Sequence, residues 1–265
     1  MSVLDCFHGA SVIVTGASSG IGRELAQRLL QLGARVTVVA RREERLHELA
    51  RGLDDPGRLL VVAGDLAERA LSERVVALAA ARFGAIDILI NNAGISMNAR
   101  FADCDPEVHR RMMDVNYFGA LYLTRAALPY LVARGGRLFF ISSIVGKRGF
   151  PTRSGYSAAK FALHGLFESL RVELVEQGVF VGILAPGYTD TEIRGTALDA
   201  SGMPRGERGM TRGDVMSATQ VAERILHAVA TRRRETVLTI GGRFMVWLNR
   251  LLPALADRVA ARVVG

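Results

Sequence analysis

The 265-residue sequence predicts a single α/β domain of three layers, in which helices cover both faces of a doubly wound parallel sheet. Short apolar segments alternate with segments of helical periodicity along most of the chain. Glycines and polar residues directly follow several of the apolar segments, which is where parallel sheets bind ligands. Hydrophobic residues make up 49% of the chain, so a large core can form.

The first strand, Ser11–Thr15, leads into a glycine-rich turn at residues 16–22 and a helix at residues 23–32. A phosphate-binding loop needs this order of strand, turn and helix. The glycines let the backbone approach a pyrophosphate, and the helix N-terminus offers free N–H groups and a positive dipole end. The residues expected at this site are Gly16, Ser18, Ser19, Gly20, Ile21 and Gly22.

The second strand, residues 34–40, is followed by Arg41 and Arg42 rather than by the acidic residue that would bind the ribose hydroxyls of NAD. A guanidinium group suits a 2′-phosphate, so the sequence favours NADP, and Ser18 could add a hydroxyl to the same phosphate. The alternative is that both arginines only begin the helix of residues 42–51 and face water.

The rest of the chain continues the alternation. Strands are predicted at residues 58–64, 86–90, 137–142, 179–184 and 236–240, and helices at residues 66–83, 106–131, 154–176 and 219–232. Right-handed crossovers place the carboxyl ends of all these strands at one edge of the sheet. The residues expected to line a crevice there are Gly16, Arg41, Asp65, Asn91, Ser143 and Pro186.

Tyr156 and Lys160 stand four residues apart in a segment rich in Ala and Leu, so they share one face of a predicted helix. A nearby ammonium favours the phenolate and is expected to lower the pKa of the tyrosine, which would make it a usable acid or base. For the pair alone, an ordinary amphipathic helix face is an equally good explanation.

These motifs together resemble the short-chain dehydrogenase/reductase family over about residues 11–191. The matching elements are the TGASSGIG turn, NNAG at residues 91–94, Ser143, the Tyr156-x-x-x-Lys160 pair and Pro186-Gly187. The resemblance implies a Rossmann-type fold and the interconversion of a secondary alcohol and a ketone. It selects Ser143 over Ser142, because the family serine precedes the tyrosine by thirteen residues.

The resemblance also implies a role for each matching residue. The catalytic residues would be Asn116, Ser143, Tyr156 and Lys160, while Asn91 would brace the sheet. Besides the glycine turn, the cofactor-binding residues would be Arg41, Arg42, Asp65, Leu66, Asn92, Ala93, Gly94, Tyr156, Lys160, Pro186, Gly187, Thr189 and Thr191. Thr189 stands where the family usually has a valine, and a backbone contact would survive this change.

Residues 188–217 are rich in Gly, Met and Arg without clear periodicity, and we expect them to form a substrate lid. A hydrophobic substrate is expected, because apolar residues fall around the site. They are Met97, Phe101, Val145, Phe150, Met203 and Met210. The same residues could equally fill the core.

The tail at residues 242–265 is apolar and basic, and Pro253 should interrupt its helix. A basic amphipathic tail suggests contact with a membrane surface. The alternative is a tail packed on its own subunit or in an oligomer interface. The resemblance separately implies a homodimer or homotetramer formed through the Asn116 and Tyr156 helices.

Charge and composition limit the kinds of partner and compartment that the sequence predicts. The net charge is +8, but no basic block with interleaved aromatics indicates nucleic-acid binding. Cys6 and Cys104 are the only cysteines, which gives no disulfide framework or metal-ligand cluster and fits a reducing cytoplasm. No signal peptide is evident, and no apolar run reaches the roughly 18 residues of a spanning helix.

The sequence therefore predicts an NADP-dependent oxidoreductase of the cytoplasm, with possible membrane association, that acts on a small apolar alcohol or ketone. Within enzymes, a reductase of β-ketoacyl chains on an acidic carrier protein is the alternative, because the chain is basic. Outside enzymes, the alternative is a cofactor-binding regulatory or scaffold protein on the same fold.

Overall fold

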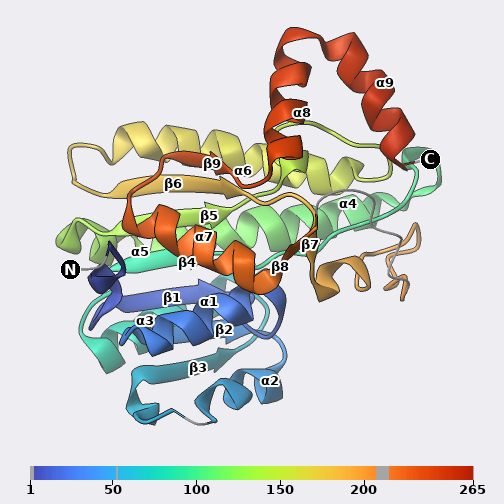
Figure 1. The fold of residues 1–265 in the computed structure, drawn as a ribbon. Coiled ribbons are helices and arrows are strands. Elements are labelled where there is room, and N and C mark those ends of the chain that lie inside the picture. Colours follow the sequence, from blue (N-terminus) through green and yellow to red (C-terminus); the bar gives the residue numbers. More distant parts are fainter. Residues whose placement is uncertain (1–2, 52, 207–214, 265) are drawn as a thin grey trace.

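The computed structural model describes residues 3–51, 53–206 and 215–264. Within these residues seven strands form one parallel sheet in the order β3-β2-β1-β4-β5-β6-β9 (Figure 1). The strands are β1 (Ser11–Thr15), β2 (Arg35–Ala40), β3 (Leu59–Ala63), β4 (Ile88–Asn91), β5 (Arg137–Ile141), β6 (Phe180–Ala185) and β9 (Glu235–Val237). The predicted fold class, a doubly wound parallel sheet between two layers of helices, is confirmed.

Helices pack on both faces of the sheet. One layer holds α1 (Gly20–Gln31), α2 (Glu43–His47) and α7 (Ala218–Ala230); the other holds α3 (Arg69–Phe83), α4 (Pro106–Met113), α5 (Gly119–Arg134) and α6 (Ser154–Glu173). Val12 and Val14 of β1 belong to the core under α1 and α7, whereas Ile13 belongs to the core under α3 and α5. Both faces of β1 are thus buried, which explains its continuous apolar sequence.

Short helical turns connect these elements. They are η1 (Val3–Phe7), η2 (Glu48–Ala50), η3 (Pro56–Arg58), η4 (Phe101–Asp103), η6 (Ile144–Gly146), η7 (Glu192–Arg194) and the π-helical η5 (Asp114–Phe118). The strand order reverses between β1 and β4, and a crevice for ligands opens at such a switch point. Thr15 pairs with Val39 and Asn91 with Phe140, so the carboxyl ends of these strands lie at one edge, as the crossover rule predicts.

Three predicted elements were wrong in part. The helix expected at residues 106–131 is divided into α4 and α5 by the π turn η5. The helix expected at residues 42–51 shortens to α2 and the turn η2. The strand expected at residues 236–240 ends at Val237, because Thr239 caps a helix by accepting the N–H of Gly242.

The C-terminal tail forms a helical hairpin that stands out from the body of the molecule (Figure 1). It consists of α8 (Ile240–Leu251) and α9 (Pro253–Val264), so the predicted interruption at Pro253 is confirmed. Arg148 holds the hairpin to the body through Asn249 Oδ1 at 2.8 Å and Asp257 Oδ1 at 2.6 Å. Among the helices described, none is both long and apolar enough to cross a membrane.

The segment expected to be a lid carries little regular structure. Its described parts contain η7 and a short parallel pair, β7 (Thr189–Asp190) with β8 (Met216–Ser217). Residues 207–214, with the expected pocket residue Met210, lie outside the described residues.

Candidate active site

The glycine turn closes the end of β1 against the end of β4. Gly16 has a φ of 69°, and a Cβ on it would lie 2.9 Å from Ala93 Cα. A Cβ on Gly22 would lie 2.3 Å from Gly16 O, so the first turn of α1 also excludes a side chain there. Ser19 is the N-cap of α1, yet its side chain does not bond the free N–H groups. A close backbone with free N–H donors fits a cofactor pyrophosphate.

Two asparagines at the end of β4 connect neighbouring elements. Asn91 Nδ2 donates to Thr124 Oγ1 of α5 at 3.1 Å, which agrees with the bracing role expected of it. Asn92 Nδ2 donates to Thr15 O at 2.8 Å, and Thr15 Oγ1 accepts the N–H groups of Asn92 and Ala93, both at 2.9 Å. These bonds fix Ala93 beside Gly16, at the border of the expected cofactor site.

Asn116 lies in the π turn η5 and is fully buried. Its Nδ2 donates to Met112 O at 2.9 Å and to Ile95 O at 3.1 Å, while its Oδ1 accepts the N–H of Ile95 at 3.1 Å. A Cβ on Gly94 would lie 2.5 Å from Asn116 Oδ1 and 3.5 Å from Lys160 Nζ, so Asn116 and Lys160 both border Gly94. A π turn at a functional site is common, because it redirects a side chain out of the helical register.

The structure joins Ser143, not Ser142, to Tyr156. Ser143 follows β5, its hydroxyl acts to lower the pKa of the Tyr156 phenol, and its Oγ accepts the N–H of Val145 at 3.4 Å. Ser142 Oγ instead lies 2.9 Å from Nε2 of the buried His164. The serine selected by the spacing of the resemblance is therefore the one beside the tyrosine.

Lys160 is only 2% exposed, and its Nζ donates to Ile141 O at 3.1 Å. Nζ lies 4.9 Å from the centre of the Phe140 ring and 5.7 Å from that of Tyr156. Because the ammonium loses its hydration, burial lowers the pKa of Lys160 to about 7.

The pKa expected for Tyr156 was wrong in direction. Burial raises the pKa of the phenol to about 12, although the hydrogen bond from Ser143 and the charge of Arg153 act in the opposite direction. Lys160 is not among the groups that lower it, which fits a lysine that burial itself keeps partly uncharged near neutral pH. Tyr156 is therefore a protonated phenol in this structure.

Arg153 was not singled out in the sequence, yet its charge acts to lower the pKa of Tyr156. Its guanidinium donates to Ser96 Oγ at 3.1 Å and to Met97 O, and burial lowers its pKa. The sequence shows an arginine three residues before Tyr156, but it precedes the predicted helix, so helical spacing gave no reason to place it beside the phenol.

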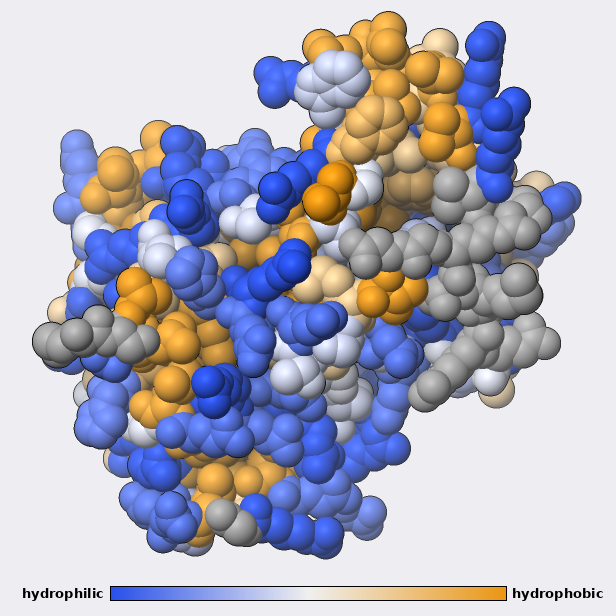
Figure 2. All heavy atoms as spheres, viewed as in Figure 1, coloured by the Kyte–Doolittle hydropathy of each residue, from blue (hydrophilic) through white to orange (hydrophobic). Residues whose placement is uncertain are grey.

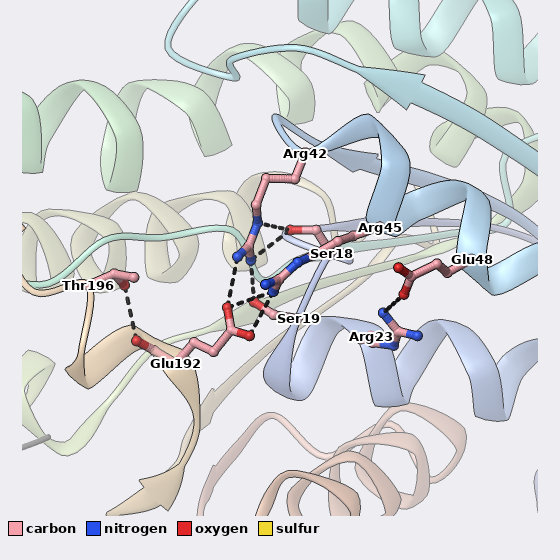
Figure 3. Close-up of polar contacts among 8 residues, drawn as sticks. All are labelled: Ser18, Ser19, Arg23, Arg42, Arg45, Glu48, Glu192 and Thr196. Carbon is pink, nitrogen blue, oxygen red and sulfur yellow. Dashed lines mark hydrogen bonds and ion pairs between the residues drawn. The ribbon is translucent and has the colours of Figure 1, made fainter. Parts of the chain in front are cut away.

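The arginines after β2 point in different directions. Arg42 donates from Nε and Nη2 to Ser18 Oγ at 3.2 and 3.1 Å, and from Nη2 to Ser19 Oγ at 2.7 Å (Figure 3). Arg42 and Arg45 both bind the carboxylate of Glu192 from η7. Arg45 and Glu192 were missed: Arg45 follows Arg42 at helical spacing, whereas no sequence signal links Glu192 to a residue 150 positions earlier.

Arg41 stays apart from this cluster. Its side chain is 62% exposed, and Nη1 lies 4.0 Å from Asp65 Oδ2. Asp65 Oδ1 accepts the N–H of Ala67 at 3.0 Å, and Leu66 is buried against Gly119. Asp65 and Leu66 thus lie at the end of β3, beside the second strand, where the adenine contact was expected.

The chain after β6 returns to the glycine turn. Pro186 O accepts the N–H of Ile144 at 3.3 Å, and Thr189 Oγ1 donates to Gly187 O at 3.2 Å. A Cβ on Gly20 would lie 3.0 Å from Thr191 Cγ2, so Thr191 rests on the first turn of α1. The segment expected to hold the carboxamide therefore spans the crevice between β6 and the turn.

The apolar residues expected around the substrate differ in their exposure. Met97 is fully buried, and its Sδ accepts the N–H of Gly155 at 3.2 Å, so it fills the core. Phe101 and Met203 are largely exposed, whereas Val145 and Phe150 are half-buried.

Comparison with known proteins decides the family. The family model described as short chain dehydrogenase matches residues 10–201. This chain belongs to the short-chain dehydrogenase/reductase family. It is 37% identical over 261 residues to the mouse protein "Dehydrogenase/reductase SDR family member 7B", covering 96% of this chain and 81% of the mouse protein. A protein of Drosophila melanogaster, "Dehydrogenase/reductase SDR family protein 7-like", is also 37% identical, covering 96% of this chain and 80% of the fly protein.

Solved structures of the family share the fold. A short-chain dehydrogenase from Streptomyces avermitilis is 30% identical with a TM-score of 0.79, covering 96% of this chain and 95% of that one. One from Burkholderia cenocepacia, in complex with NADP, is 27% identical with a TM-score of 0.80, covering 98% and 99%. This short-chain dehydrogenase/reductase is thus an oxidoreductase of a family that uses NAD or NADP, and the site described above lies at the carboxyl edge of its sheet.

Proposed function

We propose that this protein uses NADP(H) to interconvert a secondary alcohol and a ketone. One observation carries the reaction: the Ser143 hydroxyl acts directly on the Tyr156 phenol, at the same sheet edge as the glycine turn. Lys160 lies one helical turn from Tyr156, and Asn116 borders the same glycine as Lys160. A protein that only binds the cofactor has no need of all four side chains.

The chemistry follows from the protonation of the phenol. The nicotinamide supplies or accepts the hydride. During reduction, negative charge develops on the carbonyl oxygen, and the Ser143 hydroxyl can donate a hydrogen bond to it. Tyr156, held as a phenol by burial, gives its proton to this oxygen. During oxidation the proton returns from the alcohol to Tyr156.

The preference for NADP rests on the arginines. The ribose end of the crevice, after β2, carries Arg42 and Arg45 with the hydroxyls of Ser18 and Ser19. Guanidinium and hydroxyl donors match a phosphate monoester. The similar Burkholderia protein was solved in complex with NADP, which supports the same choice here.

Consumption of NADPH with a panel of aliphatic and aromatic ketones tests the reaction. Tyr156→Phe should lower kcat by about 10²- to 10⁴-fold, because it removes the proton donor, while NADPH still binds. Ser143→Ala should also lower kcat, whereas the matched Ser142→Ala should retain it, since Ser142 faces His164. Unchanged turnover in Tyr156→Phe would refute the assignment. Binding of NADPH without turnover of any ketone would favour a regulatory protein.

We further propose that the C-terminal hairpin contacts an anionic membrane surface. Ile240, Phe244, Trp247 and Leu251 are exposed at helical spacing along one face of α8. In Figure 2, hydrophobic residues (orange) gather over the hairpin, and hydrophilic residues (blue) lie beside them. Arg243 and Arg250 flank the stripe on the helix, which is the arrangement of an interfacial helix.

The base of the hairpin also touches the site. A Cβ on Gly242 would lie 2.4 Å from Ile144 Cδ1, and one on Gly187 would lie 2.5 Å from Thr239 Oγ1. Ile144 directly follows Ser143, so the start of α8 packs on the loop that carries the serine. This continuity supports a hydrophobic, lipid-like alcohol or ketone as the substrate.

A further inference from the structure

The Glu192 carboxylate holds the two arginines that the cofactor phosphate would need. Its Oε2 lies 2.8 Å from Arg42 Nη1 and 2.9 Å from Arg45 Nη1, and its Oε1 lies 2.7 Å from Arg45 Nη1. These bonds keep the pKa of Glu192 below its usual value, so it is an anion at neutral pH. Figure 3 shows both guanidinium groups directed at this one carboxylate, beside Ser18 and Ser19.

The anion at this position comes from the expected lid, not from the nucleotide-binding half of the sheet. Glu192 directly follows Thr191, whose methyl group rests on Gly20 at the start of α1. Glu192 O also accepts the N–H and the hydroxyl of Thr196, at 3.0 and 3.1 Å. The carboxylate therefore fastens residues 189–196 to the ribose end of the crevice.

A phosphate monoester would compete with this carboxylate. It carries about −1.5 to −2 charges at pH 7 and three acceptor oxygens, against one charge and two oxygens for Glu192. Ser18 and Ser19 accept bonds from Arg42 here, so their hydroxyl hydrogens can still donate to a phosphate. A cofactor without the 2′-phosphate has no group that could replace the carboxylate.

We propose that Glu192 is a specificity-determining residue, an internal anion that a 2′-phosphate must displace from Arg42 and Arg45, and that this displacement releases residues 189–196. This inference rests on the proposed use of NADP. If the carboxylate stayed in place beside the phosphate, the two anions would repel each other. The charge of Glu192 therefore opposes the binding of NADPH whether the carboxylate is displaced or stays. NADH meets no such competition, since it brings no second anion to the arginines.

The test compares dissociation constants of NADPH and NADH for the wild type, Glu192→Gln and Glu48→Gln. Glu48 is the matched control, because it is also a rim carboxylate paired with an arginine, Arg23, at 2.9 Å (Figure 3). Glu192→Gln removes two partly exposed ion pairs, so NADPH should bind about tenfold more tightly while NADH changes little. Glu48→Gln should leave the ratio of the two constants unchanged.

Release of the segment is measured by amide hydrogen exchange in the peptide of residues 192–198. Adenosine 2′,5′-bisphosphate should speed this exchange in the wild type, because the Thr196 and Ala197 amides bond to carbonyls of η7. Adenosine 5′-monophosphate should not. In Glu192→Gln the exchange should already be fast without ligand. Unchanged or slower exchange with the bisphosphate would overturn the release.

The binding outcomes separate the inference from the function on which it rests. A wild type that prefers NADPH, with Glu192→Gln weakening NADPH or leaving the ratio unchanged, would overturn only the role of Glu192. That result would mean that the carboxylate merely supports the arginines. Equal affinity for NADPH and NADH in the wild type and in Glu192→Gln alike would overturn the NADP preference as well.

Discussion

Lys160→Met should stabilise the cofactor-free protein, and by an amount that depends on pH. The Nζ atom of Lys160 is buried beside Phe140 and has one protein acceptor, Ile141 O. Burial lowers its pKa from 10.5 to about 7. Between these two values the unfolded chain binds a proton that the folded chain does not, so the stability of the wild type rises with pH.

The shift sets the magnitude. Relative to a lysine with an unperturbed pKa, burial costs about 4 kcal/mol at pH 7, about 2 kcal/mol at pH 9 and close to zero at about pH 11. Methionine has a similar length and no charge, so it removes this cost at every pH. Its effects on packing and on the bond to Ile141 O do not depend on pH and cancel when two pH values are compared.

The assay is reversible urea unfolding of both proteins, without cofactor, at pH 7 and pH 9. The gain in unfolding free energy from Lys160→Met should be about 2 kcal/mol smaller at pH 9 than at pH 7. Lys147→Met is the matched control, because the other lysine of the chain lies 2.8 Å from Glu235 in an ion pair rather than in an apolar site. A gain that is the same at both pH values would refute the depressed pKa of Lys160.

The remaining predictions concern the cofactor, the proton and the hairpin. Arg42→Ala should weaken the binding of NADPH by about 10- to 100-fold in a fluorescence titration, and Arg41→Ala should weaken it much less. The reason is that Arg42 bonds Ser18, Ser19 and Glu192, whereas Arg41 lies apart from them; equal losses of affinity would refute this. The rate of alcohol oxidation should rise with pH up to about 10, whereas ketone reduction should not, because burial keeps the pKa of Tyr156 near 12; parallel profiles would contradict it. Trp247→Ser with Phe244→Ser should abolish co-sedimentation with anionic vesicles, and loss of a dimer in gel filtration instead would assign the face to a second copy.

The sequence was sufficient for the fold because the relevant signals are local. Residues 11–22 contain a complete strand, turn and helix start, and each later strand is a short apolar run that ends in glycine or polar residues. Parallel strands buried on both faces require such runs, and the crossover rule then orders their ends. Ser143 could be placed at this edge before any contact was known, and the family resemblance added Tyr156 and Lys160 to it.

Local signals failed where a long-range contact changes the backbone. Periodicity continues through residues 106–131, yet Asn116 bonds the backbone of Ile95, from the loop after β4, and the helix takes up a π turn there. The predicted last strand failed for a similar reason. Residues 236–240 look like a strand, but Gly242 packs tightly on Ile144 and Thr239 caps α8 instead.

The electrostatics of the tyrosine show a second kind of limit. Spacing alone placed an ammonium beside Tyr156 and so predicted a lowered pKa, but spacing says nothing about how deeply either group is buried. Here burial raises the pKa of Tyr156 and lowers that of Lys160, and Lys160 is not among the groups that act on the Tyr156 phenol. The two shifts bring the groups toward a neutral phenol and a neutral amine. The cofactor-free site is thus set to give a proton, and a negative charge placed near Lys160 would restore its ammonium.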